Sequence, residues 1–297
     1  MEELIRHRAA VFRLMRAFLD EKQYFEVDTP QRVRTPGTDV NIEAFASEDK
    51  YLITSPEFHI KRLLAHGAPR VYQICHCFRK GEETDLHNSE FSMLEFYAAG
   101  MHLPEMMNET EALIRFIGDG VEKNTVTYSG NSCKLSGAWE RLTVHEAFLK
   151  YAGWSPMEAF DEDRFYYDLV DKVEQHLGVG KPTILYHYPP QLAMLSKIAK
   201  DNPPAALRFE VYLSGVEVAN AFEELNDSAE QRSRFERDLA QRTKLNLDTY
   251  PIDDRLLNAL DAMPDSCGIA VGVDRLIMLL NGSNTLEEVL LFPDSEN

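Results

Sequence analysis

The chain of 297 residues is poor in cysteine and in basic residues, and it has no long apolar run. No uninterrupted apolar stretch approaches the roughly 18 residues of a membrane-spanning helix, and no charged and then apolar leader opens the sequence. The glycine fingerprints of dinucleotide-binding folds and of P-loop proteins are both absent. Internal repeats and low-complexity tracts are absent too. We therefore expect a globular cytoplasmic protein that has no membrane partner.

The charge balance is strongly acidic. Asp and Glu number 49 against 31 Lys and Arg, which gives a formal net charge of −18 at pH 7. Such a surface repels nucleic acids and anionic membranes, although a local basic patch would still attract them. The four cysteines fit free thiols in a reducing compartment. Cys75 and Cys77 alternate on a predicted strand, and without a second Cys or His pair at zinc-finger spacing we interpret them as structural.

Helical and alternating apolar spacings predict a mixture of helices and antiparallel strands. An amphipathic helix opens the chain, and further helices are expected over 55–64, 105–117, 143–151, 161–177 and 228–245. Strands are expected over 24–30, 51–54, 71–79, 90–97, 184–188, 208–213 and 216–222. Polar loops are expected over 31–50 and 80–89, and a loop or hairpin is expected over 118–138. Because hairpins are interspersed with helices, the expected fold class is α+β, an antiparallel sheet flanked by helices.

The most informative segment is 268–280, where glycine-spaced strand residues lead into an apolar helix. Gly268 and Gly272 let a flat ligand approach the backbone closely. Arg275 stands at the start of the helix, where polyanions such as a triphosphate bind well. Taken alone, the segment is more often an ordinary junction between a strand and a helix. A nucleotide site therefore needs partners elsewhere in the sequence.

The hairpin over 71–97 supplies candidate partners. Alternation places one set of side chains on a single face: Phe91, Met93, Glu95 and Tyr97. A carboxylate and a phenol on that face suit a cationic group, and a polar pair on a surface edge strand is the alternative. Arg79 ends the first strand beside a loop that holds Lys80, His87 and Asn88, which are donors suited to phosphate. Glu57 is expected at the positive end of a helix that Ser55 caps.

The hairpin over 208–222 offers a candidate metal site. A two-residue turn at Ser214 and Gly215 sets Tyr212 opposite Glu217, and Glu210 opposite Ala219. The two glutamates then lie diagonally on one face, close enough to share a Mg²⁺ ion, and a solvated acidic face is the equally weighted alternative. Simple alternation sends Asn220, Phe222 and Glu224 to the opposite face. These residues join the same site only if the strand bulges near Ala219.

Together these segments resemble the catalytic core of class II aminoacyl-tRNA synthetases of the lysine type. Residues 18–30 resemble motif 1, 78–95 motif 2 and 268–275 motif 3, and the resemblance covers nearly the whole chain. Motif 1 begins almost at Met1, so we expect one catalytic domain over 1–297 and no anticodon-binding domain. The chain is thus similar to stand-alone paralogues that ligate lysine, preferably (R)-β-lysine, to a lysine of translation elongation factor P. Ser55 and Ala270 match that subgroup, where the tRNA synthetases tend to have alanine and glycine.

The resemblance implies a role for each matching residue. Arg79 and Arg275 would be the catalytic arginines. ATP would be bound by Arg79, Glu82, His87, Asn88, Phe91, Glu217, Val218, Gly272 and Arg275. The amino-acid substrate would be held by Ser55, Glu57, Glu95, Tyr97, Asn220, Glu224 and Ala270. The Mg²⁺ carboxylates would be Glu210 and Glu217. Two positions depart from the family pattern, because Glu82 is one place later than the usual motif 2 glutamate and Ser89 replaces a proline.

The resemblance also implies a reaction in two steps. Lysine or β-lysine would be activated with ATP and Mg²⁺, then transferred to elongation factor P, by a homodimer built on motif 1. The alternatives are a truncated synthetase acting on tRNA or another RNA, a non-catalytic regulatory paralogue, and an amide ligase of the asparagine synthetase type. The acidic charge and the missing anticodon domain disfavour the first. Retention of the arginines and the glutamate pair disfavours the second, and the carboxylate-rich pocket disfavours the third.

Overall fold

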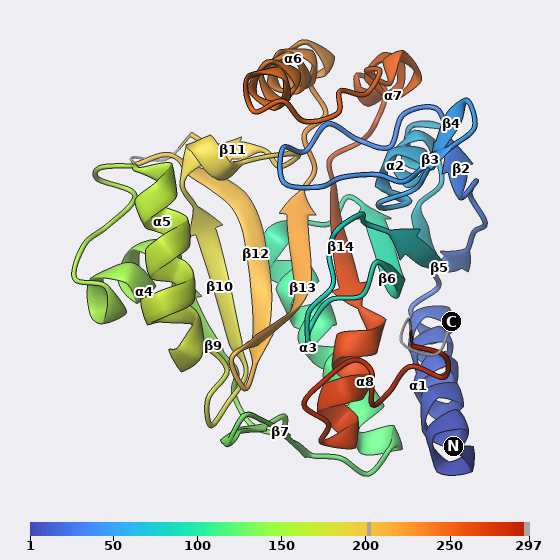
Figure 1. The fold of residues 1–297 in the computed structure, drawn as a ribbon, viewed down its shortest axis with the longest axis vertical. Coiled ribbons are helices and arrows are strands. Elements are labelled where there is room, and N and C mark those ends of the chain that lie inside the picture. Colours follow the sequence, from blue (N-terminus) through green and yellow to red (C-terminus); the bar gives the residue numbers. More distant parts are fainter. Residues whose placement is uncertain (201–202, 294–297) are drawn as a thin grey trace.

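A long, mostly antiparallel sheet forms the centre of the computed structural model, which describes residues 1–200 and 203–293. Its strands run in the order β1-β5-β6-β14-β13-β12-β10-β9, and β11 pairs with β12 (Figure 1). The bounds in that order are Phe25–Glu26, Arg70–Phe78, Glu90–Ala99, Ser266–Gly272, Val216–Glu223, Ala205–Leu213, Thr183–Tyr188 and Glu140–Thr143, with β11 at Ile198–Ala199. Among the strand pairs of this sheet in the described ranges, only β1–β5 and β9–β10 are parallel. The expected antiparallel sheet with flanking helices is confirmed.

Two small sheets lie outside this central one. The first has the order β2-β4-β3 and is built from Arg32–Val33, Lys50–Leu52 and Ala46–Ser47. The second is the hairpin of β7 and β8, Thr125–Tyr128 and Asn131–Lys134, in a segment expected to be loop or hairpin.

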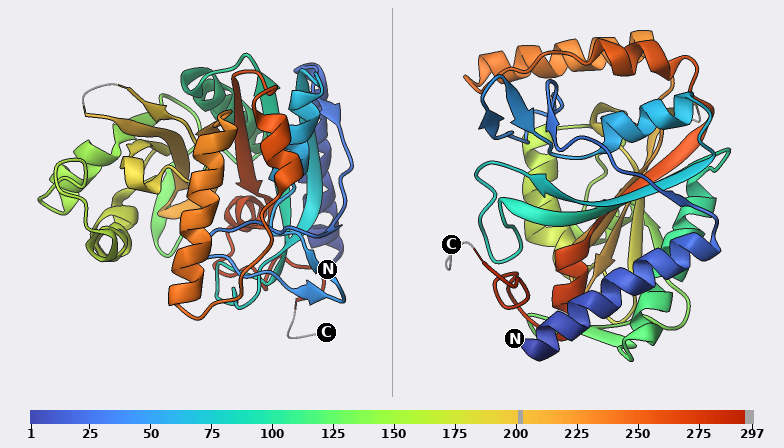
Figure 2. Two further views of the ribbon diagram at one scale, coloured as in Figure 1. Left: turned by 90° about the horizontal axis from the view of Figure 1, so that it is seen from above. Right: turned by 90° about the vertical axis from the view of Figure 1, so that its right-hand side faces the viewer.

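Helices cover the sheet on one face and at its ends. The long helices α1 (Glu2–Glu21) and α3 (Leu103–Gly120) pack with α8 (Val273–Asn281) in the largest hydrophobic cluster. The helices α4 (Val144–Tyr151) and α5 (Glu162–Asp168) lie at the β9–β10 edge. The remaining three, α2 (Glu57–Ala65), α6 (Ser228–Lys244) and α7 (Asp254–Leu260), share a separate cluster at one end of the strands (Figure 2). No helix in the described ranges is long and apolar enough to cross a membrane.

Away from the bulges, the side chains of the central strands alternate between two faces. Leu94 and Phe96 of β6 and Ile269 of β14 point into the core under α1 and α3. Met93 and Ala270, their neighbours in the chain, lie in a different cluster on the opposite face. Because α1 and α3 occupy the first face, the second face is the one that is free to bind a ligand.

The β12–β13 hairpin has the predicted turn but not the predicted register. Tyr212 pairs with Glu217 as expected, whereas Glu210 pairs with Asn220 and not with Ala219. The cause is a bulge at Val218, which adds one residue to β13 and directs Val218 and Ala219 both into the core. The bulge near Ala219 that a joint site required is therefore confirmed, and Asn220 comes to the same face as Glu210.

Several element boundaries differ from the sequence expectations. The strand over 24–30 is reduced to β1, and the helix over 161–177 breaks after α5 into a π-helical turn, Leu169–Val173, and a 3₁₀ turn, Glu174–His176. The helix expected to start at Ser55 begins at Glu57, with Pro56 as its N-cap. The charges over 228–245 predict an exposed helix, but α6 is partly buried, because its Arg234 and Arg242 are 5% and 0% exposed.

Candidate active site

Two adjoining cavities open on the sheet face opposite α1 and α3. The smaller has a volume of about 220 Å³ and the larger about 670 Å³. Both cavities share part of their lining: Arg79, Glu82, Met93, Glu217, Asn220 and Ala270. A ligand in one cavity therefore meets a ligand in the other beside Arg79.

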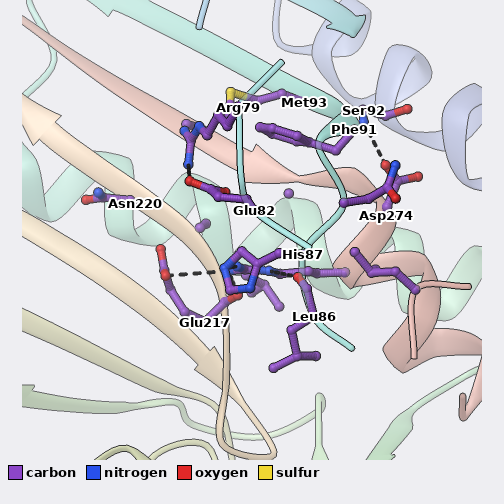
Figure 3. Close-up of a pocket in the computed structure, with 17 residues that line it drawn as sticks. Arg79, Glu82, Leu86, His87, Phe91, Ser92, Met93, Glu217, Asn220 and Asp274 are labelled. Atoms are coloured by element: carbon purple, nitrogen blue, oxygen red, sulfur yellow. Dashed lines mark hydrogen bonds and ion pairs between the residues drawn. The ribbon is translucent and has the colours of Figure 1, made fainter. Parts of the chain in front are cut away.

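The smaller cavity gathers every residue that the sequence assigned to ATP. Its lining includes Arg79, Glu82, His87, Asn88, Phe91, Glu217, Val218, Gly272 and Arg275 (Figure 3). These residues come from the end of β5, the loop after it, β6, β13 and the β14–α8 junction. Their placement agrees with the prediction, whereas the role of each residue stays a prediction.

Arg275 lies in the first turn of α8, and contacts to two other segments of the chain hold it in place. Its Nε donates to the Leu86 carbonyl oxygen at 3.0 Å, and its Nη1 donates to the Glu217 carbonyl oxygen at 2.9 Å. Its Nη2 lies 2.5 Å from His87 Nε2. Burial, followed by the charges of Arg275 and Arg79, lowers the pKa of His87 to about 4, so the ring is neutral and accepts this hydrogen bond at Nε2. Arg275 thereby connects α8 to the loop of motif 2 and to β13.

Arg79 faces both cavities with part of its guanidinium unused. The guanidinium carbon lies 5.1 Å from the centre of the Phe91 ring. Its Nη1 is 3.8 Å from Glu82 Oε1, so the displaced motif 2 glutamate still reaches the arginine. The buried Nε of Arg79 has no hydrogen-bond partner among the described residues. An unpaired buried donor is costly, and an anionic ligand at this point would satisfy it.

Asp274 links the start of α8 to two further elements. Its Oδ2 accepts a hydrogen bond from the Ser92 backbone nitrogen at 2.6 Å, and its Oδ1 lies 2.8 Å from Arg8 Nη2 on α1. Sequence reasoning missed this pair because Arg8 and Asp274 lie at opposite ends of the chain. These two contacts fix the position of Asp274, the residue that precedes Arg275 in the chain.

The predicted metal carboxylates lie together, but Glu210 already has protein donors. Its Oε1 accepts from Arg208 Nη2 at 2.5 Å, and its Oε2 accepts from the hydroxyl groups of Tyr188 at 2.5 Å and Tyr212 at 2.8 Å. Arg208 shares a face with Glu210 two residues away, so simple alternation could have found it. Tyr188 comes from β10, and no local signal in the sequence pointed to it.

Glu217 is the less tightly held carboxylate of the pair, and its one ion pair among the described residues is with Arg275. Burial and then Glu210 raise the pKa of Glu217 to about 7, and Arg275 Nη1 lies 3.5 Å from its Oε2. The side chain is 37% exposed, so water in the cavity moderates this rise. Mg²⁺ is commonly held by one or two carboxylates together with substrate phosphates. The donor set fits that ion, with Glu217 as the freer ligand.

The larger cavity contains the predicted amino-acid site at one end. Ser55, Glu57, Glu95, Asn220 and Ala270 line it, as predicted. Ser55 Oγ donates to Glu95 Oε1 at 2.7 Å and accepts from the Glu57 backbone nitrogen at 3.0 Å. Burial and then Glu57 raise the pKa of Glu95 to about 7. These carboxylates would gain from a cationic ligand.

Tyr97 and Glu224 are more deeply buried than the other residues predicted for the amino acid, and neither is part of the cavity lining, so their role stays a prediction. Tyr97 is 3% exposed and donates from its hydroxyl to Glu95 Oε2 at 2.8 Å, and Glu224 is 0% exposed. Gly268 makes this packing possible, since a Cβ there would lie 2.1 Å from the Tyr97 ring and 2.5 Å from Glu224 Oε1. The opening glycine of the motif thus serves the packing behind the amino-acid site.

Lys61 is the residue that sequence reasoning missed in this site. Its Nζ lies 2.5 Å from Glu57 Oε1 and 2.6 Å from Glu224 Oε2. A spacing of four residues between Glu57 and Lys61 on one helix is a known ion-pair signal, so the sequence could have predicted the contact with Glu57.

The cysteines behave as expected: Cys75 and Cys77 are free, and their Sγ atoms lie 3.9 Å apart.

Comparison with known proteins agrees with this geometry. A family model described as tRNA synthetases class II (D, K and N) matches residues 1–296. An elongation factor P–(R)-β-lysine ligase of Photorhabdus laumondii is 38% identical over 96% of this chain and 93% of its own. Ligases of the same name from Proteus mirabilis and Vibrio campbellii are 37% and 38% identical, over 96% and 98% of this chain and 93% and 95% of their own. The chain therefore belongs to the class II tRNA synthetase family, in the group that includes these elongation factor P–(R)-β-lysine ligases.

Proposed function

We propose that the protein is an ATP-dependent ligase that activates lysine or (R)-β-lysine as an aminoacyl-adenylate and transfers it to a lysine of elongation factor P. The observation that supports this best is the meeting of the two cavities at Arg79. One cavity is lined by donors suited to a nucleotide, and the other ends in buried carboxylates suited to ammonium groups. The names of the relatives supply the acceptor.

Arg79 would position the first step. The substrate carboxylate is ionised at neutral pH and attacks the α-phosphorus of ATP in line, and pyrophosphate leaves. No general base is needed, so the main task of the protein is to orient two anions and to stabilise the added charge. The buried Nε of Arg79 supplies a fixed donor at the point where both ligands meet. Phe91 and Arg275 would then hold the adenine ring between them.

Glu217 and Glu210 would hold Mg²⁺, which supplies charge neutralisation for the phosphates when it is bound. Arg208, Tyr188 and Tyr212 keep Glu210 in a single orientation. Arg275 ties the Glu217 segment to α8 through the Glu217 carbonyl oxygen.

The carboxylates of the larger cavity would select a dibasic amino acid. Glu57 and Glu95 offer two anions in a buried setting, which neutral amino acids cannot compensate. Ala270 pairs with Asn220 on the neighbouring strand. Its methyl group would narrow the pocket between Asn220 and the two glutamates. Transfer would follow when a neutral acceptor amine attacks the adenylate carbonyl and AMP leaves.

We further propose a homodimer formed through α1 and β1, acting as a single catalytic domain in the cytoplasm. Phe25 on β1 is 62% exposed at the edge of the central sheet, and Ile5 on α1 is 47% exposed. Exposed apolar side chains on an edge strand and on the helix before it favour burial against a second copy.

Pyrophosphate exchange tests the proposed function directly. Exchange should depend on α-lysine or β-lysine, and the activated amino acid should then label elongation factor P. If neither amino acid supports exchange, the proposed enzymatic activity is wrong. Stable lysyl-tRNA formation without labelling of elongation factor P would reject the protein ligase in favour of an RNA-directed one.

A further inference from the structure

Arg8 of α1 is a largely buried cation next to the smaller cavity. Its side chain is 12% exposed, and its Nη2 lies 2.8 Å from Oδ1 of Asp274, whose side chain is 3% exposed. Its Nη1 donates to the Val289 carbonyl oxygen at 2.9 Å. Arg8 is not part of the described lining of either cavity. Any effect of Arg8 on a ligand must therefore pass through these two contacts.

Asp274, the first contact, is a carboxylate in the lining of the smaller cavity. Its Oδ2 accepts a hydrogen bond from the Ser92 backbone nitrogen at 2.6 Å. The ladder between β6 and β14 ends at the pair of Met93 and Gly272, one residue before this contact. The side chain of Asp274 therefore extends the ladder where the chain has already turned into α8. Phe91, the residue before Ser92, lines the same cavity.

The segment after α8 is the second contact. The Val289 nitrogen donates to the Leu286 carbonyl oxygen at 3.0 Å, and the Leu286 nitrogen donates to the Asp85 carbonyl oxygen at 2.8 Å. Leu286 lines the smaller cavity, and Asp85 belongs to the loop of motif 2. Through this segment Arg8 is connected to the same loop that holds Arg275.

An unpaired carboxylate in this lining would be unfavourable for a nucleotide. Burial leaves little water to screen the charge of Asp274, and in the described ranges its Oδ1 has no hydrogen-bond partner besides the ion pair with Arg8. The triphosphate of ATP carries several negative charges, which such a carboxylate would repel. Arg8 offsets this charge from outside the lining, while Asp274 keeps its hydrogen bond to Ser92.

The direction of Arg8 distinguishes it from other arginines of the same helix. Arg6 pairs with Glu2 one turn away on α1, and the two side chains are 77% and 81% exposed. Arg16 pairs with Glu26, and both side chains are 42% exposed. Ion pairs at such exposure contribute little to stability and reach no cavity. The pair of Arg8 with Asp274 is the buried one, and it ends at the nucleotide site.

We propose that Arg8 is a positioning residue for the nucleotide, which offsets the charge of Asp274 and holds the first turn of α8 and the segment around Val289 against the cavity. Arg8 itself does not touch the nucleotide. The inference rests on the proposed function for the identity of the ligand. It adds a residue of α1 to a site that is otherwise built by motifs 2 and 3 and by β13.

Calorimetry on the full chain tests this role, with ATP and Mg²⁺ in one titration and lysine alone in another. Arg8→Met should weaken ATP binding about tenfold, because Asp274 then faces the phosphates without its counter-charge. Lysine binding should stay within about twofold of the wild type, because Arg8 has no contact at the amino-acid end of the larger cavity. Arg8→Lys offers one point of charge in place of a two-pronged guanidinium, so it should weaken ATP binding about threefold.

A double variant tests whether the charge of Asp274 is the cause. Asn at position 274 still offers an oxygen to the Ser92 nitrogen but carries no charge. Arg8→Met with Asp274→Asn should therefore bind ATP more tightly than Arg8→Met, within about threefold of the wild type. The proposal is overturned if the double variant binds ATP no better than Arg8→Met, or if Arg8→Met weakens ATP and lysine binding equally. If Arg8→Met does not fold, Arg8→Lys decides, and wild-type ATP affinity in that variant overturns the proposal.

Failure of the proposed function would give a different result. A wild-type protein that binds no ATP would reject the function itself, whereas wild-type ATP binding by Arg8→Met would reject only the role of Arg8. Arg6→Met, which removes an exposed ion pair from the same helix, is the matched control and should bind both ligands as the wild type does. In exchange assays, Arg8→Met should raise the KM for ATP and leave the KM for lysine unchanged.

Discussion

The guanidinium of Arg275 and the imidazole of His87 lie 2.5 Å apart, Nη2 to Nε2, although both groups can carry positive charge. The contact requires a neutral histidine, whose other ring nitrogen, Nδ1, lies 2.8 Å from Thr84 Oγ1. With Nε2 accepting from Arg275, the proton is on Nδ1 and Thr84 accepts it. The nucleotide end of the site thus depends on a histidine that is kept uncharged.

Acid should loosen this contact before it unfolds other parts of the protein. The pKa of His87 falls from 6.5 to about 4 on folding, so the unfolded chain gains a proton first as the pH drops. The stabilisation is complete above about pH 6.5 and is lost as the pH falls towards 4. His87→Gln should therefore lose less thermal stability over this window than the wild type. Equal melting-temperature profiles for the two proteins would contradict the assignment.

Two glycines of motif 3 should respond differently to the same substitution. Gly268→Ala places a Cβ 2.1 Å from the Tyr97 ring, so we expect a loss of about 1–3 kcal/mol in unfolding free energy and a higher KM for lysine. Gly272→Ala meets nothing closer than 3.7 Å, so it should fold normally and raise the KM for ATP alone. Thermal melts and substrate titrations of both variants check this, and identical effects would contradict the two-cavity assignment.

Glu217 should matter more to catalysis than to folding. Glu217→Gln removes a half-buried carboxylate that few protein donors hold, so we expect adenylation to fall by about 10²–10³ while the melting temperature holds or rises. Exchange assays over a range of Mg²⁺ concentrations measure the effect. Glu158→Gln, an exposed position, is the control. Wild-type exchange in Glu217→Gln would remove this residue from the metal site.

The proposed dimer gives a prediction that can be measured by mass. Phe25→Glu puts a charge on the exposed edge strand β1, where a second copy is proposed to pack. The wild type should have the mass of two chains in light scattering, and the variant should shift towards one. A monomeric wild type would contradict the proposal outright.

Much of this architecture was predictable from the sequence because local patterns carry it. Alternation over 90–97 put Glu95 and Tyr97 on one face, and the Ser214–Gly215 turn fixed the start of the second hairpin register. The positive φ angles of these two turn residues, 53° and 85°, are those of a two-residue hairpin turn. In each case, residues close in the chain determine the outcome.

The rest depended on contacts between distant segments. The bulge at Val218 follows from packing of both Val218 and Ala219 into the core, which a period of two cannot express. Tyr188 contacts Glu210 from another strand. Glu224 contacts Lys61, which is 163 positions away in the sequence, because the end of β13 lies next to α2. Glu224 is fully buried behind the cavity wall, and the residues next to it in the sequence do not indicate this burial.

The central claim is that two substrates meet at Arg79, and lysine-dependent pyrophosphate exchange by Arg79→Ala compared with the wild type tests it most directly. We predict exchange in the wild type with lysine or β-lysine, and a loss of about 10²-fold or more in the variant. Calorimetry should show that the variant still binds lysine through its ammonium groups, because Glu57 and Glu95 are intact. Wild-type exchange rates in Arg79→Ala would contradict the account.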